Sequence, residues 1–501
     1  MICVSIACGS HKRMISELAG LAEAGIRLVE LRLDFLRKMP DLGRLLPNRK
    51  VPVIVTVRRK QDGGLWGYDE EKRMVLLRTA IISGADYVDI ESDIAAKIPR
   101  YGKTKRVISY HNFEKTPSDL DALRDEILKT ADPDIIKIAV TPKSVSDLFR
   151  LFAFMKKANA PGAPKPTVVI GMGELGMPTR ILGKKFGVPF TYSTFSQQRI
   201  VAPGILYYKT LRDEYRYESL NADTEVYGVM ADPIAHSLSP LIHNASFASA
   251  KLNKVYIPFR VPAEEAAEFI EKAPSIDVRG LSVTIPHKSA VIPKLTRLDP
   301  AVEEIDACNT ILFHSDAIFG YNTDYLASAL CIETAMGGMQ GDTSPIAGKQ
   351  ILVLGAGGAG KAVAYGLIKK GGRVTIADRT AEKAEKAASQ LGCSYCDWDA
   401  RKSYVANILA NCTSVGMYPD IDQTPIGPES IRNGMYVFDA VYNPEQTYLL
   451  RLAKQKGATP ISGLEMFIGQ ACLQFRLFTG EKTSASMIRA LLKEALSMSK
   501  S

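Results

Sequence analysis

Lys137 stands in an otherwise apolar run, IIKIAV (135–140), which is typical of a buried β-strand. Burial disfavours a charged ammonium, so this position favours the neutral amine that attacks a ketone to form a Schiff base. His111 ends another such run, RVISYH (106–111), and a histidine near its ordinary pKa moves protons at neutral pH. A lone strand lysine is more often a snorkelling or edge residue, and a lone histidine a core residue. The two together indicate a site for imine chemistry.

Five more charged side chains lie in, or just after, strand-like runs of the same region. Glu30 and Arg32 are two residues apart and therefore share one face of their strand. Arginine suits a substrate carboxylate, because a guanidinium binds it through two parallel hydrogen bonds. The five candidates for substrate binding are Glu30, Arg32, Arg58, Asp62 and Arg180.

A glycine-rich turn, GAGGAG (355–360), indicates a second kind of chemistry. It follows the apolar run QILVL and opens a helical pattern, and Gly355, Gly357 and Gly360 satisfy G-x-G-x-x-G. In this strand–turn–helix context the backbone can approach a pyrophosphate at the helix N-terminus. The turn therefore predicts a dinucleotide-binding site.

The next strand-like run, VTIADRT (374–380), ends in two conflicting signals. Asp378 is placed like the acid that binds the ribose 2′-hydroxyl of NAD, whereas Arg379 and Thr380 suit the 2′-phosphate of NADP. We favour NADP on the arginine and the threonine. A surface Asp-Arg pair with no cofactor role is the third alternative.

A polar set lies outside this nucleotide unit, in four short segments between residues 235 and 324. Taken singly, its serines, asparagine and aspartate are what turns and helix caps favour. Taken together, they suit a polyol that carries a carboxylate. The set comprises Ser237, Ser239, His287, Lys288, Asn309 and Asp324.

Short β-rich runs alternate with amphipathic helical patterns from residue 2 to residue 195. This alternation predicts an α/β fold with a parallel sheet, and eight units fit a (β/α)8 barrel of about 220 residues whose chemistry lies where the strands end. An open doubly wound sheet is the alternative, but the region has no dinucleotide glycine signature. The runs span residues 2–7, 26–34, 51–58, 87–92, 106–111, 135–140, 167–172 and 190–195.

Alternating patterns resume at residue 226 and predict a further α/β region after the barrel, which the Gly-rich stretch at 333–349 divides into two lobes. The first lobe carries the polar set, as an α/β substrate lobe would, and the second carries the glycine turn, as a Rossmann-type nucleotide lobe would. We expect a barrel over residues 1–218, a linker over 219–225, a substrate-binding lobe over 226–335 completed by C-terminal helices over 466–501, and a nucleotide lobe over 346–465.

The composition is that of a globular protein, with 46% hydrophobic and 23% charged residues among 501. The net charge of +9 is spread along the chain, which favours a basic surface or pockets for small anions over nucleic-acid binding. No apolar stretch long enough for a membrane span and no signal peptide is present, so we expect a cytoplasmic protein. Of eight cysteines only Cys393 and Cys396 form a CxxC, which favours free thiols and no metal site.

Five motifs of the barrel region occur in order: ELRLD (30–34), VTVRR (55–59), SYHNF (109–113), IKIAV (136–140) and APG (202–204). They resemble the type I 3-dehydroquinate dehydratase family over about residues 1–215. The resemblance implies that 3-dehydroquinate loses water to give 3-dehydroshikimate, through an imine on Lys137 with His111 as the general acid and base. It places the five charged candidates around the substrate.

The barrel region departs from that family at three positions. Asp62 stands where the family usually has a glutamate. Val201 and Ile205 flank the APG motif where the family usually has a serine and a glutamine. Two side chains of this loop that could hydrogen-bond the substrate are therefore apolar here.

The second half carries NCTSVGM (411–417), DAVYNP (439–444) and GLEMFIGQA (463–471) beside the polar set and the glycine turn. From about residue 227 to 492 it resembles shikimate dehydrogenase, which implies reversible hydride transfer between NADPH and 3-dehydroshikimate to give shikimate. Lys288 and Asp324 match the catalytic pair, which gives a proton to the nascent alkoxide or stabilises its charge.

The same resemblance implies the ligand-binding residues of the second half. Two residues depart from the family, Ser282 and Asp378, each where an asparagine is usual. The implied substrate-binding residues are Ser237, Ser239, Thr284, Asn309, Tyr442 and Gln470. The implied cofactor-binding residues are Gly355, Gly357, Gly358, Gly360, Asp378, Arg379, Thr380, Thr413 and Gly463.

The product of the first half is the substrate of the second, so we expect a bifunctional enzyme of the shikimate pathway. Its partners are then 3-dehydroquinate, 3-dehydroshikimate, shikimate and NADP, with no nucleic acid and no membrane. One alternative is an NAD-dependent quinate/shikimate dehydrogenase of catabolism, which Asp378 supports. The other is a metabolite-sensing pseudoenzyme regulator, against which the retention of all four catalytic candidates argues.

Overall fold

The structure, a computed structural model, describes residues 1–199, 201–235, 237–339 and 341–498. The chain divides into two compact units. The first consists of Met1–Val226, Pro233–Ala235 and Asn253–Ile276, and the second of Tyr227–Asp232, His236–Leu252 and Asp277–Ser501. The division into a barrel, a linker and two lobes at the boundaries given above stays a prediction.

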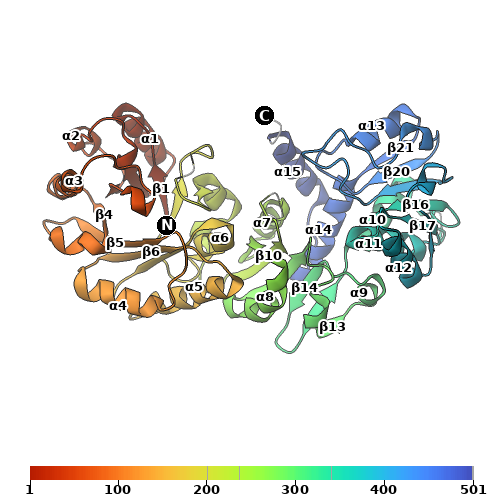
Figure 1. Ribbon diagram of the computed structural model, residues 1–501, viewed down its shortest axis with the longest axis horizontal. Coiled ribbons are helices and arrows are strands. Elements are labelled where there is room, and N and C mark those ends of the chain that lie inside the picture. Colours follow the sequence, from red (N-terminus) through yellow and green to blue (C-terminus); the bar gives the residue numbers. More distant parts are fainter. Residues whose placement is uncertain (200, 236, 340, 499–501) are drawn as a thin grey trace. The chain divides into compact units, whose positions relative to one another are not determined.

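The first unit is built on a curled parallel sheet in the order β7-β6-β5-β4-β3-β2-β1-β8-β9 (Figure 1). β1 pairs on one side with β2 and on the other with β8, so that Cys3 lies between Leu28 and Tyr192. This joining of the first and eighth strands confirms the predicted barrel architecture, although the described residues form no ladder between β7 and β8. The strands are β1 (Ile2–Ile6), β2 (Leu28–Arg32), β3 (Val53–Thr56), β4 (Tyr87–Glu91), β5 (Lys105–Asn112), β6 (Ile135–Val140), β7 (Thr167–Gly171), β8 (Thr191–Thr194) and β9 (Leu206–Tyr207).

Helices begin soon after the strands end, at positions where polar side chains cap the helix N-termini. Ser10 and Ser144, for example, each accept a hydrogen bond from the backbone N–H three residues later. The strands themselves are almost wholly buried, which is why they read as near-continuous apolar runs. The helices are α1 (His11–Glu23), α2 (Leu42–Leu45), α3 (Glu70–Ile82), α4 (Leu120–Thr130), α5 (Val145–Ala158) and α6 (Gly173–Leu182).

The first unit also contains β11 (Lys254–Arg260) and α8 (Ala266–Lys272), which come from the second half of the sequence. They pack against α5 and α6. The rings of Phe149 and Phe269 lie 5.7 Å apart, and Lys272 Nζ donates to Ser146 Oγ at 3.1 Å. The sequence did not predict this grouping, since the pattern of each half can be read without the other.

The second unit contains a mixed sheet in which β10, β12, β14, β15 and β13 follow one another. α14 packs against α7, α10, β12 and β14 (Figure 1). The strands are β10 (Glu225–Ala231), β12 (Val278–Val283), β13 (Arg297–Leu298), β14 (Thr310–Phe313) and β15 (Ile318–Tyr321). The helices are α7 (Ser239–Ser249), α9 (Pro300–Ile305), α10 (Asp324–Ala335), α14 (Gly463–Thr479) and α15 (Ala485–Met498).

A parallel sheet in the order β18-β17-β16-β19-β20-β21 forms the rest of the second unit. This order is that of the dinucleotide-binding Rossmann fold, in which ligands bind where the strand order reverses, here between β16 and β19. The predicted nucleotide fold is therefore confirmed. The strands are β16 (Gln350–Leu354), β17 (Arg373–Ala377), β18 (Ser394–Tyr395), β19 (Ile408–Asn411), β20 (Tyr436–Asp439) and β21 (Thr459–Ser462), with helices α11 (Gly358–Lys369), α12 (Ala381–Leu391) and α13 (Tyr448–Gln455).

The close contact between α10 and α11 yields a stability prediction. A Cβ atom at Gly366 in α11 would lie 2.4 Å from the carbonyl oxygen of Tyr325 in α10. We expect Gly366→Ala to lower the free energy of unfolding of this unit by about 1–3 kcal/mol through overpacking. Chemical denaturation would measure it.

The matched control is Gly20→Ala in α1, where a Cβ would have nothing within 4 Å. We expect this variant to gain about 0.5–1 kcal/mol, because alanine favours the helix over glycine. A destabilisation of the same size in both variants would contradict the contact between the two helices as the cause.

Candidate active sites

A cavity in the barrel is lined by every site residue that the sequence predicted for this half. Lys137 comes from β6, His111 from the end of β5, and Glu30 and Arg32 from β2. The other three follow strands or lie on α6. They are Arg58, Asp62 and Arg180.

Lys137 lies in a charged setting rather than the apolar one that its strand suggested. Its Nζ is 3.0 Å from Asp89 Oδ2 and 4.3 Å from the centre of the Tyr192 ring. The expectation of an apolar setting is wrong because neighbours along a strand point to the opposite face. The side chains that surround Lys137 come from β4 and β8, which lie elsewhere in the sequence.

Asp89 is the centre of a buried ionic array. Its Oδ2 is also 2.6 Å from Arg58 Nη2, and its Oδ1 accepts a hydrogen bond from Ser109 Oγ at 2.6 Å. Burial opposes ionisation, but the charges of Arg58 and Lys137 outweigh it and hold the pKa of Asp89 well below its usual range. Arg58 Nη1 pairs in turn with Glu91 at 2.7 Å.

Like Arg58, three more of the predicted substrate-binding side chains have partners within the protein. Glu30 accepts hydrogen bonds from Ser5 Oγ at 2.5 Å and Thr56 Oγ1 at 2.8 Å. The other two are held in ion pairs. Arg32 forms a bidentate pair with Asp34 at 2.8–2.9 Å, and Asp62 pairs with Arg59 at 2.6 Å.

Arg180 differs from these residues, because no carboxylate among the described residues pairs with it. Its Nη2 donates to the carbonyl of Pro203 at 3.1 Å, and its buried Nε has no hydrogen-bond partner. Burial lowers the pKa of Arg180 to about 10. Among the described cations that line the cavity, Arg180 is thus the one available to a bound carboxylate.

His111 also lines the cavity, and its buried Nδ1 has no hydrogen-bond partner among the described residues. Burial, with the positive charges of Arg58 and Lys137, lowers the pKa of His111 well below its ordinary value. The expectation of a pKa near neutrality is therefore wrong. The imidazole is neutral at pH 7 and can accept a proton.

The loop that departs from the family forms an apolar wall of the same cavity. Val201, Ala202 and Ile205 line it together with Met172. The loop approaches α6 closely, since a Cβ at Gly204 would lie 2.4 Å from the carbonyl oxygen of Gly173.

Several residues of this site were not predicted. Asp89 and Glu91 are two apart in YVDIES (87–92), the same spacing that singled out Glu30 and Arg32, so the signal was present in the sequence. The hydroxyl partners carry no such signal, because serine and threonine are common in strands. They are Ser5, Thr56 and Ser109. Tyr192, which contacts Lys137 through its ring, was also not predicted.

In the second unit the predicted catalytic pair is joined directly. Lys288 Nζ lies 2.6 Å from Asp324 Oδ2. Asp324 begins α10, and its backbone N–H donates to Asn322 Oδ1 at 3.0 Å. A Cβ at Gly358 would lie 3.3 Å from Lys288 Cδ, which puts the pair beside the glycine turn.

A hydrogen-bond network behind this pair fixes the ends of β12 and β14. Asn309 Oδ1 accepts from the N–H of Thr323 at 2.8 Å, and its own carbonyl accepts from the N–H of Val283, next to Thr284, at 2.8 Å. Ser282 Oγ donates to Gln474 Oε1 at 2.8 Å, so this departure from the family supports a buried glutamine.

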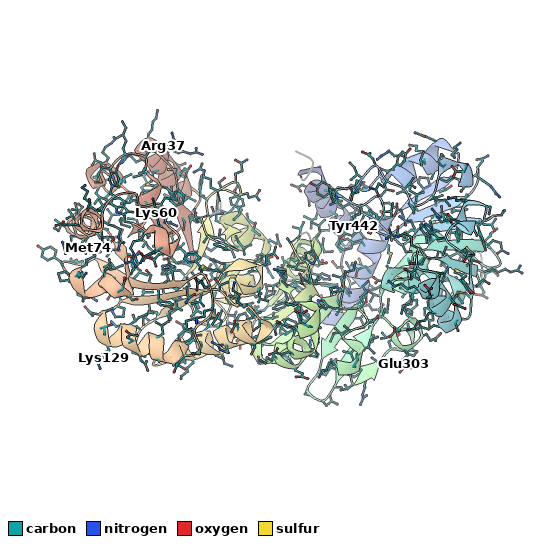
Figure 2. The ribbon with its side chains drawn as sticks, viewed as in Figure 1. Arg37, Lys60, Met74, Lys129, Glu303 and Tyr442 are labelled. Atoms are coloured by element: carbon teal, nitrogen blue, oxygen red, sulfur yellow. The ribbon has the colours of Figure 1, made fainter. Side chains whose placement is uncertain are left out.

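The remaining predicted substrate-binding residues lie at helices α7 and α14. The ring of Tyr442, labelled in Figure 2, stacks on Phe467 at 4.6 Å. Gln470 Nε2 donates to the carbonyl of Phe467 at 3.0 Å. Leu238, between Ser237 and Ser239, belongs to the same apolar cluster as the two stacked rings.

The glycine turn has the geometry of a dinucleotide cradle. Gly355 has φ +102°, and a Cβ at Gly360 would lie 1.9 Å from its carbonyl oxygen, so both positions require glycine. Gly357 faces open space, and α11 begins at the next residue. These residues fit a pyrophosphate at the helix N-terminus. Thr413 lies beside the turn, with Cγ2 3.3 Å from a Cβ at Gly355.

Asp378 is tied to this turn rather than free. Its Oδ2 accepts from the N–H of Ala356 at 2.8 Å and its Oδ1 from the N–H of Thr380 at 2.9 Å. Arg379 and Thr380 are exposed. Gly463 begins α14, and a Cβ there would lie 2.5 Å from the carbonyl oxygen of Asp439.

Asp439 is a buried carboxylate that was not predicted as a single residue. It accepts hydrogen bonds from Thr447 Oγ1 at 2.6 Å, Asn411 Nδ2 at 2.9 Å and the N–H of Val441 at 3.1 Å. Burial nevertheless raises the pKa of Asp439 to about 6. It joins the loop that carries Thr413 to the loop that carries Tyr442.

Within the described ranges no group of three or more His, Cys, Asp or Glu side chains is placed to hold a metal ion. The eight cysteines are free thiols. No helix of the described parts is long and apolar enough to cross a membrane.

Four family profiles match successive parts of the chain. Type I 3-dehydroquinase matches residues 2–222, and the shikimate dehydrogenase substrate binding domain matches 229–311. Shikimate/quinate 5-dehydrogenase matches 339–417, and the shikimate 5′-dehydrogenase C-terminal domain matches 463–492.

Relatives and solved structures agree with these profiles. A crystal structure of shikimate dehydrogenase in complex with NADP+ is 34% identical, with a TM-score of 0.52 over 55% of this chain and 97% of that one. Quinate dehydrogenase from Corynebacterium glutamicum in complex with NAD is 25% identical, with a TM-score of 0.50 over 54% of this chain and 99% of that one. The chloroplastic bifunctional 3-dehydroquinate dehydratase/shikimate dehydrogenase of Arabidopsis thaliana is 39% identical over 96% of this chain and 82% of its own length. The chain therefore belongs to the family of bifunctional 3-dehydroquinate dehydratase/shikimate dehydrogenases.

Proposed function

We propose that the barrel cavity dehydrates 3-dehydroquinate to 3-dehydroshikimate through an imine on Lys137. The observation that carries the proposal is the presence, in one cavity, of a buried lysine and of a buried arginine for which the described residues provide no carboxylate partner. Arg180 would bind the carboxylate of the substrate. Its ketone would then lie near Lys137.

His111 would move the protons of this reaction. Lys137 Nζ attacks the ketone carbon, and water leaves as the C=N bond forms. The positive nitrogen withdraws electrons from the neighbouring carbon, whose proton passes to the neutral imidazole of His111. The imidazolium then protonates the leaving hydroxyl, and hydrolysis of the imine releases the product.

The second unit would reduce 3-dehydroshikimate to shikimate. When bound, NADP supplies or accepts the hydride. Lys288 would donate a proton to the nascent alkoxide, and Asp324, at 2.6 Å, holds the ammonium in place. The substrate would contact Ser237, Ser239, Thr284, Asn309, Tyr442 and Gln470.

The choice of NADP is supported by the hydrogen bonds of Asp378 and by the exposure of Arg379 and Thr380, which follow β17. Both oxygens of Asp378 are engaged by backbone N–H groups, so its carboxylate serves the turn. Arg379 and Thr380 remain exposed beside it and suit a 2′-phosphate. The glycines of residues 355–360 and Thr413 would hold the pyrophosphate and the nicotinamide side of the cofactor.

A cytoplasmic location, expected from the sequence, is part of the proposal, whereas the Arabidopsis relative is named chloroplastic.

Reciprocal variants test the two activities. We expect Lys137→Ala to abolish dehydration and borohydride trapping of a dehydroquinate adduct, while shikimate oxidation is retained. We expect Lys288→Ala to reduce shikimate oxidation by about 10²–10⁴-fold, while dehydration is retained. Steady-state rates of both reactions in each purified variant would measure this.

Each variant controls for the folding of the other. An adduct on another lysine would contradict the imine assignment. A wild-type chain that folds but turns over neither substrate would favour the pseudoenzyme alternative.

Cofactor choice has its own test at Arg379. We expect Arg379→Ala to raise the KM for NADPH by about 10–100-fold, the value of a charged hydrogen bond, and to leave the KM for NADH nearly unchanged. The matched control is Arg373→Ala, which removes the same charge from the opposite end of β17. A wild-type preference for NADH would instead favour the NAD-dependent alternative.

A further inference from the structure

We propose that Asp89 is a further catalytic residue of the dehydratase site, whose ionised carboxylate stabilises the positive charge on the Lys137 nitrogen before and after imine formation. The inference rests on the proposed imine chemistry. It concerns a residue that none of the sequence motifs singled out.

The geometry fixes the carboxylate against the reacting atom. Asp89 is 1% exposed, and its Oδ2 lies 3.0 Å from Lys137 Nζ. The same oxygen is 2.6 Å from Arg58 Nη2, while Oδ1 accepts from Ser109 Oγ at 2.6 Å. With contacts on both oxygens the carboxylate cannot rotate away. It therefore needs no reorganisation during the reaction.

A fixed anion beside the Lys137 nitrogen stabilises this reaction because the nitrogen carries a positive charge before and after imine formation. An ammonium and a ketone give a protonated imine and one water, so a single positive charge stays on the same nitrogen. That charge is the electron sink for the later proton abstraction. An anion beside the nitrogen keeps the imine protonated and so keeps the sink in place.

Neither other carboxylate of the cavity takes this role. Glu30 is hydrogen-bonded by two hydroxyls and Asp62 is paired with Arg59. In the described parts of the chain neither forms an ion pair with Lys137. The titratable groups that face Lys137 and Asp89 from the surrounding strands are Cys3, Glu30, Arg58, His111 and Tyr192.

The array beyond Asp89 keeps it ionised. Arg58 is shared between Asp89 and Glu91, and Arg73 pairs with Glu91 at 2.7 Å. Arg73 also pairs with Glu70 on α3 at 2.6 Å. Opposite charges thus alternate from Lys137 to the surface, so protonation of Asp89 would leave the buried Lys137 without its ion-pair partner and Arg58 with Glu91 alone.

Asp89→Asn tests the proposal, because it removes the charge and nearly preserves the shape. Without the anion the ammonium is disfavoured beside Arg58, so the amine becomes free at lower pH. The amount of borohydride-trapped adduct falls as the pH is lowered, and we call this fall the acid limb of its pH profile. We expect the acid limb to move down by about 1–3 pH units. We expect kcat for dehydration to fall by about 100-fold, as when other groups that stabilise developing charge are removed.

Three variants make the result specific. Ser109→Ala keeps the charge and is expected to leave the acid limb in place, as is the charge-conserving Asp89→Glu. Asp89→Ser is a second uncharged variant, for use if the Asp89→Asn protein does not fold. It is expected to show the same displacement of the acid limb. Shikimate oxidation by the other half of the chain reports on folding in every variant.

An acid limb of Asp89→Asn or Asp89→Ser that coincides with the wild type would overturn the proposal even if kcat falls, because a merely structural residue gives that pattern. A displaced limb supports it. If the wild type itself forms no adduct with dehydroquinate, the proposed imine function fails, which is a separate result.

Discussion

The barrel half depends on opposite charges that alternate in its interior. A buried charge is costly unless it is paired, and removing one partner leaves the next uncompensated. The register of the strands must therefore hold the array together before any chemistry can occur. At the same time the array leaves one cation, Arg180, for a substrate. The alternating residues are Lys137, Asp89, Arg58, Glu91, Arg73 and Glu70.

The second half depends on contact distances rather than on charge. Gly366 lets α11 approach α10, whose first residue is Asp324. At the other end of α11, Gly358 lies against the stem of Lys288. The helix that is proposed to receive the pyrophosphate therefore also helps to place Lys288 and Asp324. Small residues at these two contacts would link cofactor binding to the proposed proton transfer.

Most of the fold could be predicted from the sequence, because buried parallel strands leave continuous apolar runs. The bounds of β4, β6 and β7, for example, agree with the predicted runs to within one residue. The seven charged or titratable candidates of the barrel cavity were also predictable, since they stand in or after strand-like runs. Their pairing was not: Asp89 meets Lys137 across 48 positions of sequence, and spacing alone cannot show which carboxylate faces which cation. Neither could it show that β11 and α8 pack on α5 and α6, which depends on tertiary contacts.

Asp378 has two tasks that evolution cannot change separately. Its carboxylate fastens the glycine turn through Ala356 and also places a negative charge next to Arg379. A mutation to asparagine would remove the negative charge and weaken the fastening in one step. A mutation at Arg379 would change only the charge, because that side chain is exposed. The asparagine that is usual in the family has a single acceptor oxygen for the two N–H groups, so the aspartate of this chain holds its glycine turn more firmly and places a negative charge beside Arg379.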